Sequence, residues 1–187
     1  MIDRALKGAR SFSHVLVWIG GSLILLSAIL VTIEVFMRKI FNMSLGGADE
    51  LSGYAFGVAT TCAFAYALFE RAHIRVDALY NLFPRPLRIV LSLIGLVLLI
   101  GFAAVASWMA FGLVADTLTH GSRSITPMRV PLAIPQIPWL LGWLFFVLAG
   151  ILLLVAALKR CLAGDLDGAD HLVGTKSIDE QIDDEAP

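Results

Sequence analysis

The residues in this sequence that could do chemistry are few and far apart. The four histidines lie at positions 14, 73, 120 and 171, and neither they nor Cys62 and Cys161 have the spacing of a metal or haem site. The sequence also lacks a glycine-rich phosphate-binding loop. It therefore predicts no catalytic, cofactor-binding or metal-binding residues, and we expect this chain not to be an enzyme.

Glu34 and Arg38 are the acid and base best placed to act together. They stand four residues apart with the acid first, which is the favourable order for an ion pair on one helix. An acid in a membrane-spanning segment is a candidate functional group by default. Because Glu34 lies at the end of an apolar run and has Arg38 one turn away, the structural interpretation is favoured over a role as a coupling acid.

The elements that carry these residues are long apolar runs. Of the 187 residues, 58% are hydrophobic and only 16% are charged, against about 25% in an ordinary soluble domain. The runs 11–33, 51–69, 89–115 and 138–158 are each long enough to cross about 30 Å of hydrocarbon as a helix. The sequence predicts an all-α integral membrane protein. Its domain, 12–160, should have four transmembrane helices at about 12–37, 50–69, 87–115 and 137–159. A soluble enzyme, a DNA-binding protein and a disordered chain are disfavoured.

The distribution of Lys and Arg predicts the orientation of these helices. Basic residues are concentrated in 1–11, in the loop between the second and third helices, and just after the fourth. By the positive-inside rule, these segments and both termini face the cytoplasm. Residues 1–11 form either an amphipathic lead-in helix or a short basic start that only sets topology. Residues 161–187 are acidic, and their composition predicts a disordered cytoplasmic tail.

The second helix carries small residues along one broad face. Gly53, Gly57, Thr61 and Ala65 recur every four residues, and a series of alanines runs beside them. Small faces let helices approach closely in a membrane, whereas surfaces that face lipid are bulkier. We expect this face to be buried against other helices, and the pattern leaves open whether those belong to this chain or to a partner.

The two outer loops differ in character. Asp49 and Glu50 end the first loop at the N-terminus of the second helix, where Asp can cap and both charges suit the helix dipole. The second loop, 116–138, has prolines at positions 127, 131, 135 and 138, which disfavour a regular helix and favour extended backbone. Its apolar residues need cover from this chain or from a docked protein.

The inner loop, 70–86, concentrates its polar residues before an apolar patch. His73 could be a ligand or a proton carrier. Since no second His or Cys is near in sequence, an interfacial hydrogen-bonding role is favoured.

Three motifs, in order along the four spans, resemble a known family. They are 48–54 (ADELSGY) at the start of the second helix, 71–77 (RAHIRVD) in the inner loop, and 134–139 (IPQIPW) before the fourth helix. From about residue 12 to 160, the chain is similar to the small membrane subunit, called DctQ-like, of tripartite ATP-independent periplasmic (TRAP) transporters. Ala72 departs from the glycine that is common there, and the acidic tail lies outside the resemblance.

The resemblance implies a location and a set of partners. The chain would lie in the bacterial inner (cytoplasmic) membrane as the small scaffold subunit of a sodium-driven, binding-protein-dependent secondary importer of organic acids. Its partners would be a large TRAP membrane subunit, a periplasmic solute-binding protein and membrane lipids, and no nucleic acid. No cofactor is expected on this chain, because the sodium and substrate sites would lie on the large subunit.

Candidate surfaces follow from the resemblance together with the patterns above. The candidates for contact with the large subunit are Gly53, Tyr54, Gly57, Thr61 and Ala65. The candidates for periplasmic docking or for topology are Asp49, Glu50, Arg123, Arg129, Pro131 and Pro135. We expect His73, Arg75 and Asp77 to fix the inner loop at the membrane surface or at the large subunit.

Two other functions compete with this interpretation. One is a self-sufficient small four-helix transporter or channel that acts as an oligomer, with Glu34 as its coupling acid. The other is a membrane-bound redox enzyme. The second, third and fourth spans have no charged residue and no proline near their middle, where solute and ion sites usually lie. The sequence therefore favours a subunit that packs and recognises over one that transports alone.

Overall fold

A computed structural model of the chain describes residues 2–72 and 84–174, without the side chains of residues 85, 169 and 171. Over these residues it is helical, with α1 (Ile2–Phe41), α2 (Ala48–Phe69), α4 (Arg85–His120), α5 (Ala133–Leu162) and a short α6 (Leu166–Val173). Four of these, α1, α2, α4 and α5, are long and apolar enough to cross a membrane. The predicted all-α fold with four transmembrane helices is therefore confirmed, whereas the cytoplasmic location of the termini stays a prediction.

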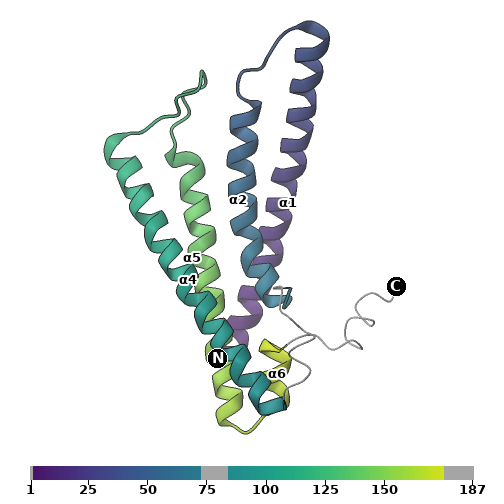
Figure 1. Cartoon of the computed structure of the whole chain (residues 1–187), viewed down its shortest axis with the longest axis vertical. Coiled ribbons are helices and arrows are strands. Elements are labelled where there is room, and N and C mark those ends of the chain that lie inside the picture. Colours follow the sequence, from purple (N-terminus) through teal and green to yellow (C-terminus); the bar gives the residue numbers. More distant parts are fainter. Residues whose placement is uncertain (1, 73–83, 175–187) are drawn as a thin grey trace.

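The four long helices lie in a row rather than in a closed bundle. α5 packs between α4 and α2, and α2 packs between α5 and α1 (Figure 1). We call the end that holds the N-terminus and α6 the inner end, and the opposite end the outer end. At the inner end, the start of α1 also reaches α5, and α6 packs on α4 and α5. The outer half is thus a layer about one helix thick, whose helices fan apart.

The first helix is longer than a membrane is thick. α1 runs without a break for 40 residues, so the basic lead-in and the first span form one helix. At about 1.5 Å per residue it is about 60 Å long. Because this exceeds the hydrocarbon thickness, α1 must tilt or extend beyond the interface.

The proline-rich outer segment is partly helical, which corrects the prediction that its prolines forbid a regular helix. α5 begins at Ala133, earlier than the predicted start near 137, so Pro135 as well as Pro138 lies inside it. The first N–H groups of a helix have no intrahelical acceptor, so Pro135, in the first turn, costs no hydrogen bond. Pro138 is further in and cannot donate to the carbonyl of Ile134. Only residues 121–132 lack helix, as predicted.

Small residues bring α2 close to its neighbours on both sides. A Cβ on Gly20 of α1 would lie 3.0 Å from the carbonyl oxygen of Ala59. A Cβ on Gly142 of α5 would lie 2.6 Å from Thr61 Cβ and 3.0 Å from the Thr61 carbonyl carbon. Lipid tails are as apolar as the side chains they surround, so helices in a membrane associate through close packing. These two contacts therefore hold α2 at the centre of the row.

The core lies toward the inner end, where α2, α4, α5 and α6 converge. Gly150 lets α5 approach α4, because a Cβ on it would be 2.8 Å from Ile100 Cγ1. The buried cluster consists of Ala65, Leu68, Phe69, Leu96, Ala103, Phe146, Ala149, Leu153, Ala157 and Val173.

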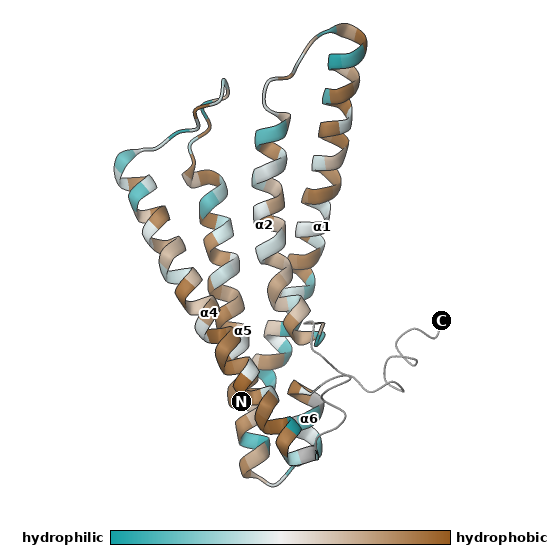
Figure 2. Ribbon diagram, in the orientation of Figure 1, coloured by the Kyte–Doolittle hydropathy of each residue, from teal (hydrophilic) through white to brown (hydrophobic). Residues whose placement is uncertain are grey.

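Outside this core, apolar side chains cover much of the surface. Figure 2 shows brown, hydrophobic residues along the whole length of α1, α4 and α5. Trp18 on α1 is 75% exposed and Trp108 on α4 is 79% exposed. Such surfaces require hydrocarbon or another protein around them.

The acidic tail begins with a packed helix, which differs from the disorder expected for 161–187. The side chain of Asp165 accepts a hydrogen bond from Gly168 N at 2.8 Å and so caps α6. Arg160 Nη1 donates to the carbonyl of Gly168 at 2.9 Å, and Val173 is buried against the core. The cap and the apolar face together stabilise α6 despite the acidic composition. Residues 175–187 lie outside the described residues.

We expect Gly142→Ala to destabilise the fold, because the new methyl group would push into the Thr61 side chain and backbone of α2. Overpacking of this kind costs about 1–3 kcal/mol, which exceeds the gain of up to about 1 kcal/mol from replacing a helical glycine. Thermal unfolding of the purified chain in detergent measures the change. Gly101→Ala, which faces open space on α4, is the matched control and should not lower stability. Equal stability of the two variants would contradict the α2–α5 contact.

Candidate partner-binding surface

Glu34 ties the loop after α1 to the end of that helix. Its side chain is nearly buried, at 3% exposure of the residue. Oε1 accepts hydrogen bonds from Arg38 Nη2 at 2.8 Å and Ser44 Oγ at 2.5 Å, and Oε2 accepts one from Leu45 N at 2.7 Å. The predicted Glu34–Arg38 ion pair is confirmed. A carboxylate whose two oxygens are both bonded to its own loop acts as a structural group, which counts against Glu34 as a coupling acid.

Glu50 joins α2 to the loop between α4 and α5. Oε1 accepts a hydrogen bond from Tyr54 Oη at 2.6 Å, one turn further along α2. Oε2 accepts a hydrogen bond from Thr126 Oγ1, which in turn lies 2.9 Å from Ser124 Oγ. We call Glu50, Tyr54, Ser124 and Thr126 the outer polar cluster. It links segments far apart in the sequence and holds the α4–α5 loop over the outer end of α2.

That loop is a short hairpin with its own backbone hydrogen bonds. Ser124 N donates to Val130 O at 2.9 Å, and Leu132 N donates to Ser122 O at 3.1 Å. Arg123 and Pro131 face each other in an antiparallel bridge. Arg129 has a positive φ of 47°, which turns the chain between the two arms. We call residues 122–132 the outer hairpin.

The outer hairpin presents an apolar tip beside two cations. Ile125 is fully exposed, and Met128 is 45% exposed although it also touches Gly47, the residue before α2. Arg123 and Arg129 are exposed as well. The structure thus gathers Glu50, Arg123, Arg129 and Pro131, four of the six residues expected at a docking site, around one hairpin. Pro135 is half-buried in the first turn of α5.

Asp49 does not cap α2, which corrects the prediction from its position. The N-cap is Gly47, and no side chain accepts a hydrogen bond from the first N–H groups of the helix. Leu51 N donates to Gly47 O at 3.0 Å and so closes the first turn two residues earlier than a cap at Asp49 would. A side chain at Gly47 would collide with Met128, so the packing of the hairpin selects glycine there. Asp49 and Glu50 both stay in the first turn, where their charges suit the helix dipole.

The five candidate residues for contact with the large subunit fall into two groups. Thr61 and Ala65 are 2% and 0% exposed, buried within this chain. Gly53 and Gly57 lie where the helices have spread apart. A Cβ on Gly53 would meet nothing within 4 Å, and one on Gly57 would meet only Trp139 Cδ1, at 3.9 Å. The glycine pair therefore makes no close helix contact inside this chain, and Tyr54 serves the outer polar cluster.

At the inner end, Arg10 Nη2 and Glu70 Oε1 form an ion pair of 2.8 Å between α1 and the end of α2. The candidate residues His73, Arg75 and Asp77 lie outside the described residues, so their role stays a prediction.

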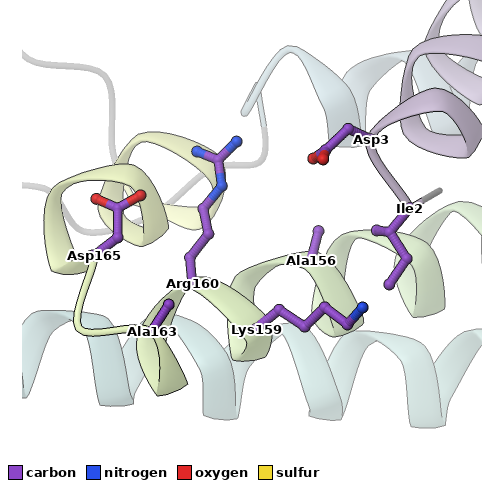
Figure 3. A pocket seen from close by; sticks show the side chains of 7 residues that line it. All are labelled: Ile2, Asp3, Ala156, Lys159, Arg160, Ala163 and Asp165. Atoms are coloured by element: carbon purple, nitrogen blue, oxygen red, sulfur yellow. The ribbon is translucent and has the colours of Figure 1, made fainter.

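A hollow of about 470 Å³ lies between the start of α1 and the end of α5 (Figure 3). Its lining carries two basic and two acidic side chains, a mixture that selects no ion of one sign; the lining residues are Ile2, Asp3, Ala156, Lys159, Arg160, Ala163 and Asp165.

Sequence reasoning missed the hydroxyl partners of the two carboxylates. Ser44, Ser124 and Thr126 are common loop residue types and attract no notice by themselves. One signal was present: Ser124 and Thr126 flank Ile125, and such alternation in extended backbone puts both hydroxyls on one side and the apolar residue on the other. Within the described ranges, no three His, Cys, Asp or Glu residues are grouped so as to hold a metal ion.

Comparison with known proteins identifies one related family. Residues 27–160 match the family model described as tripartite ATP-independent periplasmic transporters, DctQ component. The match runs from the middle of α1 almost to the end of α5, and so includes the outer polar cluster and the outer hairpin. No curated protein and no solved structure matches the chain.

We expect Glu50→Ala to release the outer hairpin from α2, because Thr126 and Tyr54 lose their shared acceptor. Amide hydrogen exchange over 122–132 should accelerate on the order of tenfold, as expected when hydrogen bonds to a charged group are lost. Asp49→Ala is the matched control. It removes a carboxylate from the same helical turn that makes no hydrogen bond to the hairpin. If both variants exchange at the wild-type rate, Glu50 does not anchor the hairpin.

Proposed function

The chain belongs to the DctQ family, the small membrane components of tripartite ATP-independent periplasmic transporters, and we propose that it is the scaffold subunit of a sodium-driven importer of organic acids. Transporters of this family work with a large membrane subunit and a periplasmic solute-binding protein. The chain is an inner-membrane transport component, and its family is not a family of enzymes.

The row of helices is the observation that carries the scaffold role. The outer half, a layer about one helix thick, has no interior in which a solute path could be enclosed, and the inner end is filled by the apolar core. Its broad faces are apolar, with residues such as Leu98 and Phe102 on α4 and Leu25 on α1 more than 60% exposed. A layer of this kind can stiffen and widen a neighbouring membrane protein by packing one face against it. The transport of the solute itself then falls to the large subunit.

We propose the outer part of α2 as the surface for the large subunit. Thr61 and Ala65 pack inside this chain, so a partner would meet the stretch nearer the outer end. Gly53 and Gly57 are open there, and small residues let a partner helix approach closely. Tyr54 lies between them and could contact a partner only with the part of its ring that the chain leaves exposed.

The outer hairpin is the element that we propose for docking of the solute-binding protein. Its backbone hydrogen bonds and the outer polar cluster hold the hairpin in place, so it would lose little conformational entropy on binding the solute-binding protein. The apolar tip at Ile125 offers contact area, and Arg123 and Arg129 attract an acidic surface.

The remaining parts of the proposal rest on the family resemblance. Sodium coupling and the organic acid would be properties of sites on the large subunit. Both termini would face the cytoplasm, as the Lys and Arg distribution predicts. His73, Arg75 and Asp77 would hold the inner loop at the membrane surface or at the large subunit.

We expect Gly57→Leu to weaken assembly with the large subunit, because the added side chain would keep a partner helix away from α2. The measurement is the yield of complex when the two chains are co-expressed and purified in mild detergent. A fall of about tenfold or more fits the cost of overpacking a helix contact. Gly57→Ala, whose Cβ would make only an ordinary contact with Trp139, is the matched control and should assemble normally. The thermal stability of the Gly57→Leu chain by itself is measured as well. A lower stability would indicate a local disturbance of Trp139, whereas an unchanged stability would attribute weaker assembly to the lost interface. Unchanged assembly would remove this part of α2 from the contact.

We expect the double charge reversal Arg123→Glu, Arg129→Glu to lower uptake that depends on the solute-binding protein, because two attractive charges become repulsive. The defect should appear as a higher concentration of binding protein needed for half-maximal uptake in proteoliposomes. Assembly of the two membrane subunits should not change. Lys39→Glu, an exposed cation at the outer end of α1, is the control outside the hairpin. A wild-type dependence on binding protein would place docking elsewhere.

A further inference from the structure

A groove separates α1 from α2 in the outer half of the layer. Its volume is about 470 Å³, and its walls include Ile24, Ala28 and Val31 of α1 and Asp49, Gly53 and Phe56 of α2. The two helices touch at Gly20 and Ala59 and then diverge toward the outer end (Figure 1). The groove lies along this divergence. The volume falls within the range of about 300–1,000 Å³ that is usual for small-molecule sites.

The chain itself bounds the groove at both ends. At the inner end, the backbone contact of Gly20 with Ala59 brings the helices together. At the outer end, Glu34 binds Ser44 and Leu45 in the loop that connects α1 to α2. The stretch from Phe56 to Asp49 spans about 10 Å of helix at 1.5 Å per residue. The groove is thus about two helical turns long.

The lining of the groove calls for an apolar occupant. Ser27 Oγ already donates to Leu23 O at 2.8 Å, and Ser52 Oγ donates to Asp49 O at 2.9 Å. With these hydroxyls bonded to their own helices, water would find few partners between the walls. An empty groove would leave its apolar walls without van der Waals contacts. Hydrocarbon from the membrane would restore those contacts, so a filled groove is favoured over an empty one.

Asp49 supplies the one charge on the lining, at the outer end of the groove. Its carboxylate is exposed and makes no hydrogen bond or ion pair with the part of the chain that the structure describes. Asp49 lies in the first turn of α2, at the outer end of this apolar span, so a lipid in the groove would hold its headgroup near this carboxylate. A carboxylate there attracts an ammonium group and repels a purely anionic headgroup.

We propose that the groove between α1 and α2 binds one acyl chain of a phosphatidylethanolamine molecule, whose ammonium group lies at Asp49. The apolar walls select a hydrocarbon chain, and the single carboxylate selects a headgroup with a compact, hydrogen-bonding cation. The walls and the charge of the groove all belong to this chain, so the site can be tested without the large subunit. Gly53 also belongs to the α2 surface proposed above for that subunit, so this inference rests in part on the proposed function.

Native mass spectrometry of the purified, delipidated full chain tests the proposal, with phosphatidylethanolamine, phosphatidylcholine and phosphatidylglycerol as probes. Phosphatidylethanolamine should bind in preference to the other two by about threefold or more, the scale of an exposed ion pair. Asp49→Asn should abolish this preference while hydrocarbon binding persists. Gly53→Leu and Ala28→Leu, which fill the groove from opposite walls, should reduce the binding of all three lipids. Gly101→Leu, on the exposed surface of α4, is the matched control and should bind as the wild type does.

Four results would overturn the proposal. Equal binding of the three lipids, or an unchanged preference in Asp49→Asn, would show that Asp49 does not select the headgroup. Unchanged binding in both groove-filling variants would show that the lipid lies elsewhere. A photoreactive residue at position 27, in the transporter assembled with the large subunit, should label lipid; labelling of the large subunit instead would identify a protein as the occupant. The yield of complex with the large subunit is measured in the same preparation. A normal yield together with labelling of the large subunit would contradict the lipid site alone, whereas a lost complex would contradict the scaffold proposal.

Discussion

The close packing of α2 between α1 and α5 is the constraint on which the rest of the structure depends. In a membrane, apolar side chains gain little by leaving lipid for one another, so helices stay together where their backbones can approach. α2 meets α1 at Ala59, opposite Gly20, and meets α5 at Thr61, opposite Gly142. These residues point to different sides of the helix, which makes α2 the middle of a row. A row, unlike a bundle, exposes two apolar faces that lipid or a partner must cover.

Polar contacts near the helix ends add to the close packing of the small residues. Glu34 fastens the α1–α2 loop, Glu50 fastens the outer hairpin, and Arg10 pairs with Glu70 at the other end. All three carboxylates lie near helix ends, away from the middle of the spans. Glu34 and Glu50 hold loops in position, and Glu50 keeps the outer hairpin above α2. This arrangement agrees with a subunit that holds and presents surfaces to other proteins.

Several predictions from the sequence failed at the ends of helices. Asp49 has the type and position of a helix cap, yet α2 begins two residues earlier, with Gly47 as its N-cap beside the side chain of Met128. Pro135 is predicted to lie in extended backbone, before a fourth helix expected from 137, yet α5 begins at Ala133 and holds Pro135 in its first turn. Residues 166–173 belong to an acidic tail, yet a cap at Asp165 and the burial of Val173 make them a helix. The position of Met128 beside Gly47 and the burial of Val173 are long-range contacts that sequence spacing does not reveal. The Asp165 cap and the start of α5 are local features that sequence reasoning did not recognise.

The sequence by itself determined the class of the molecule, its four spans and its family, because long apolar runs and short motifs are local properties. It also indicated the Glu34–Arg38 pair, since both residues lie on one helix. Only the tertiary structure decided which small residues pack inside this chain and which stay open to a partner. Thr61 and Ala65 were buried inside it, whereas Gly53 and Gly57 were left open. The reason is the angle between α1, α2 and α5: helices that touch near the middle of α2 and diverge beyond it bury one half of a small-residue face and uncover the other.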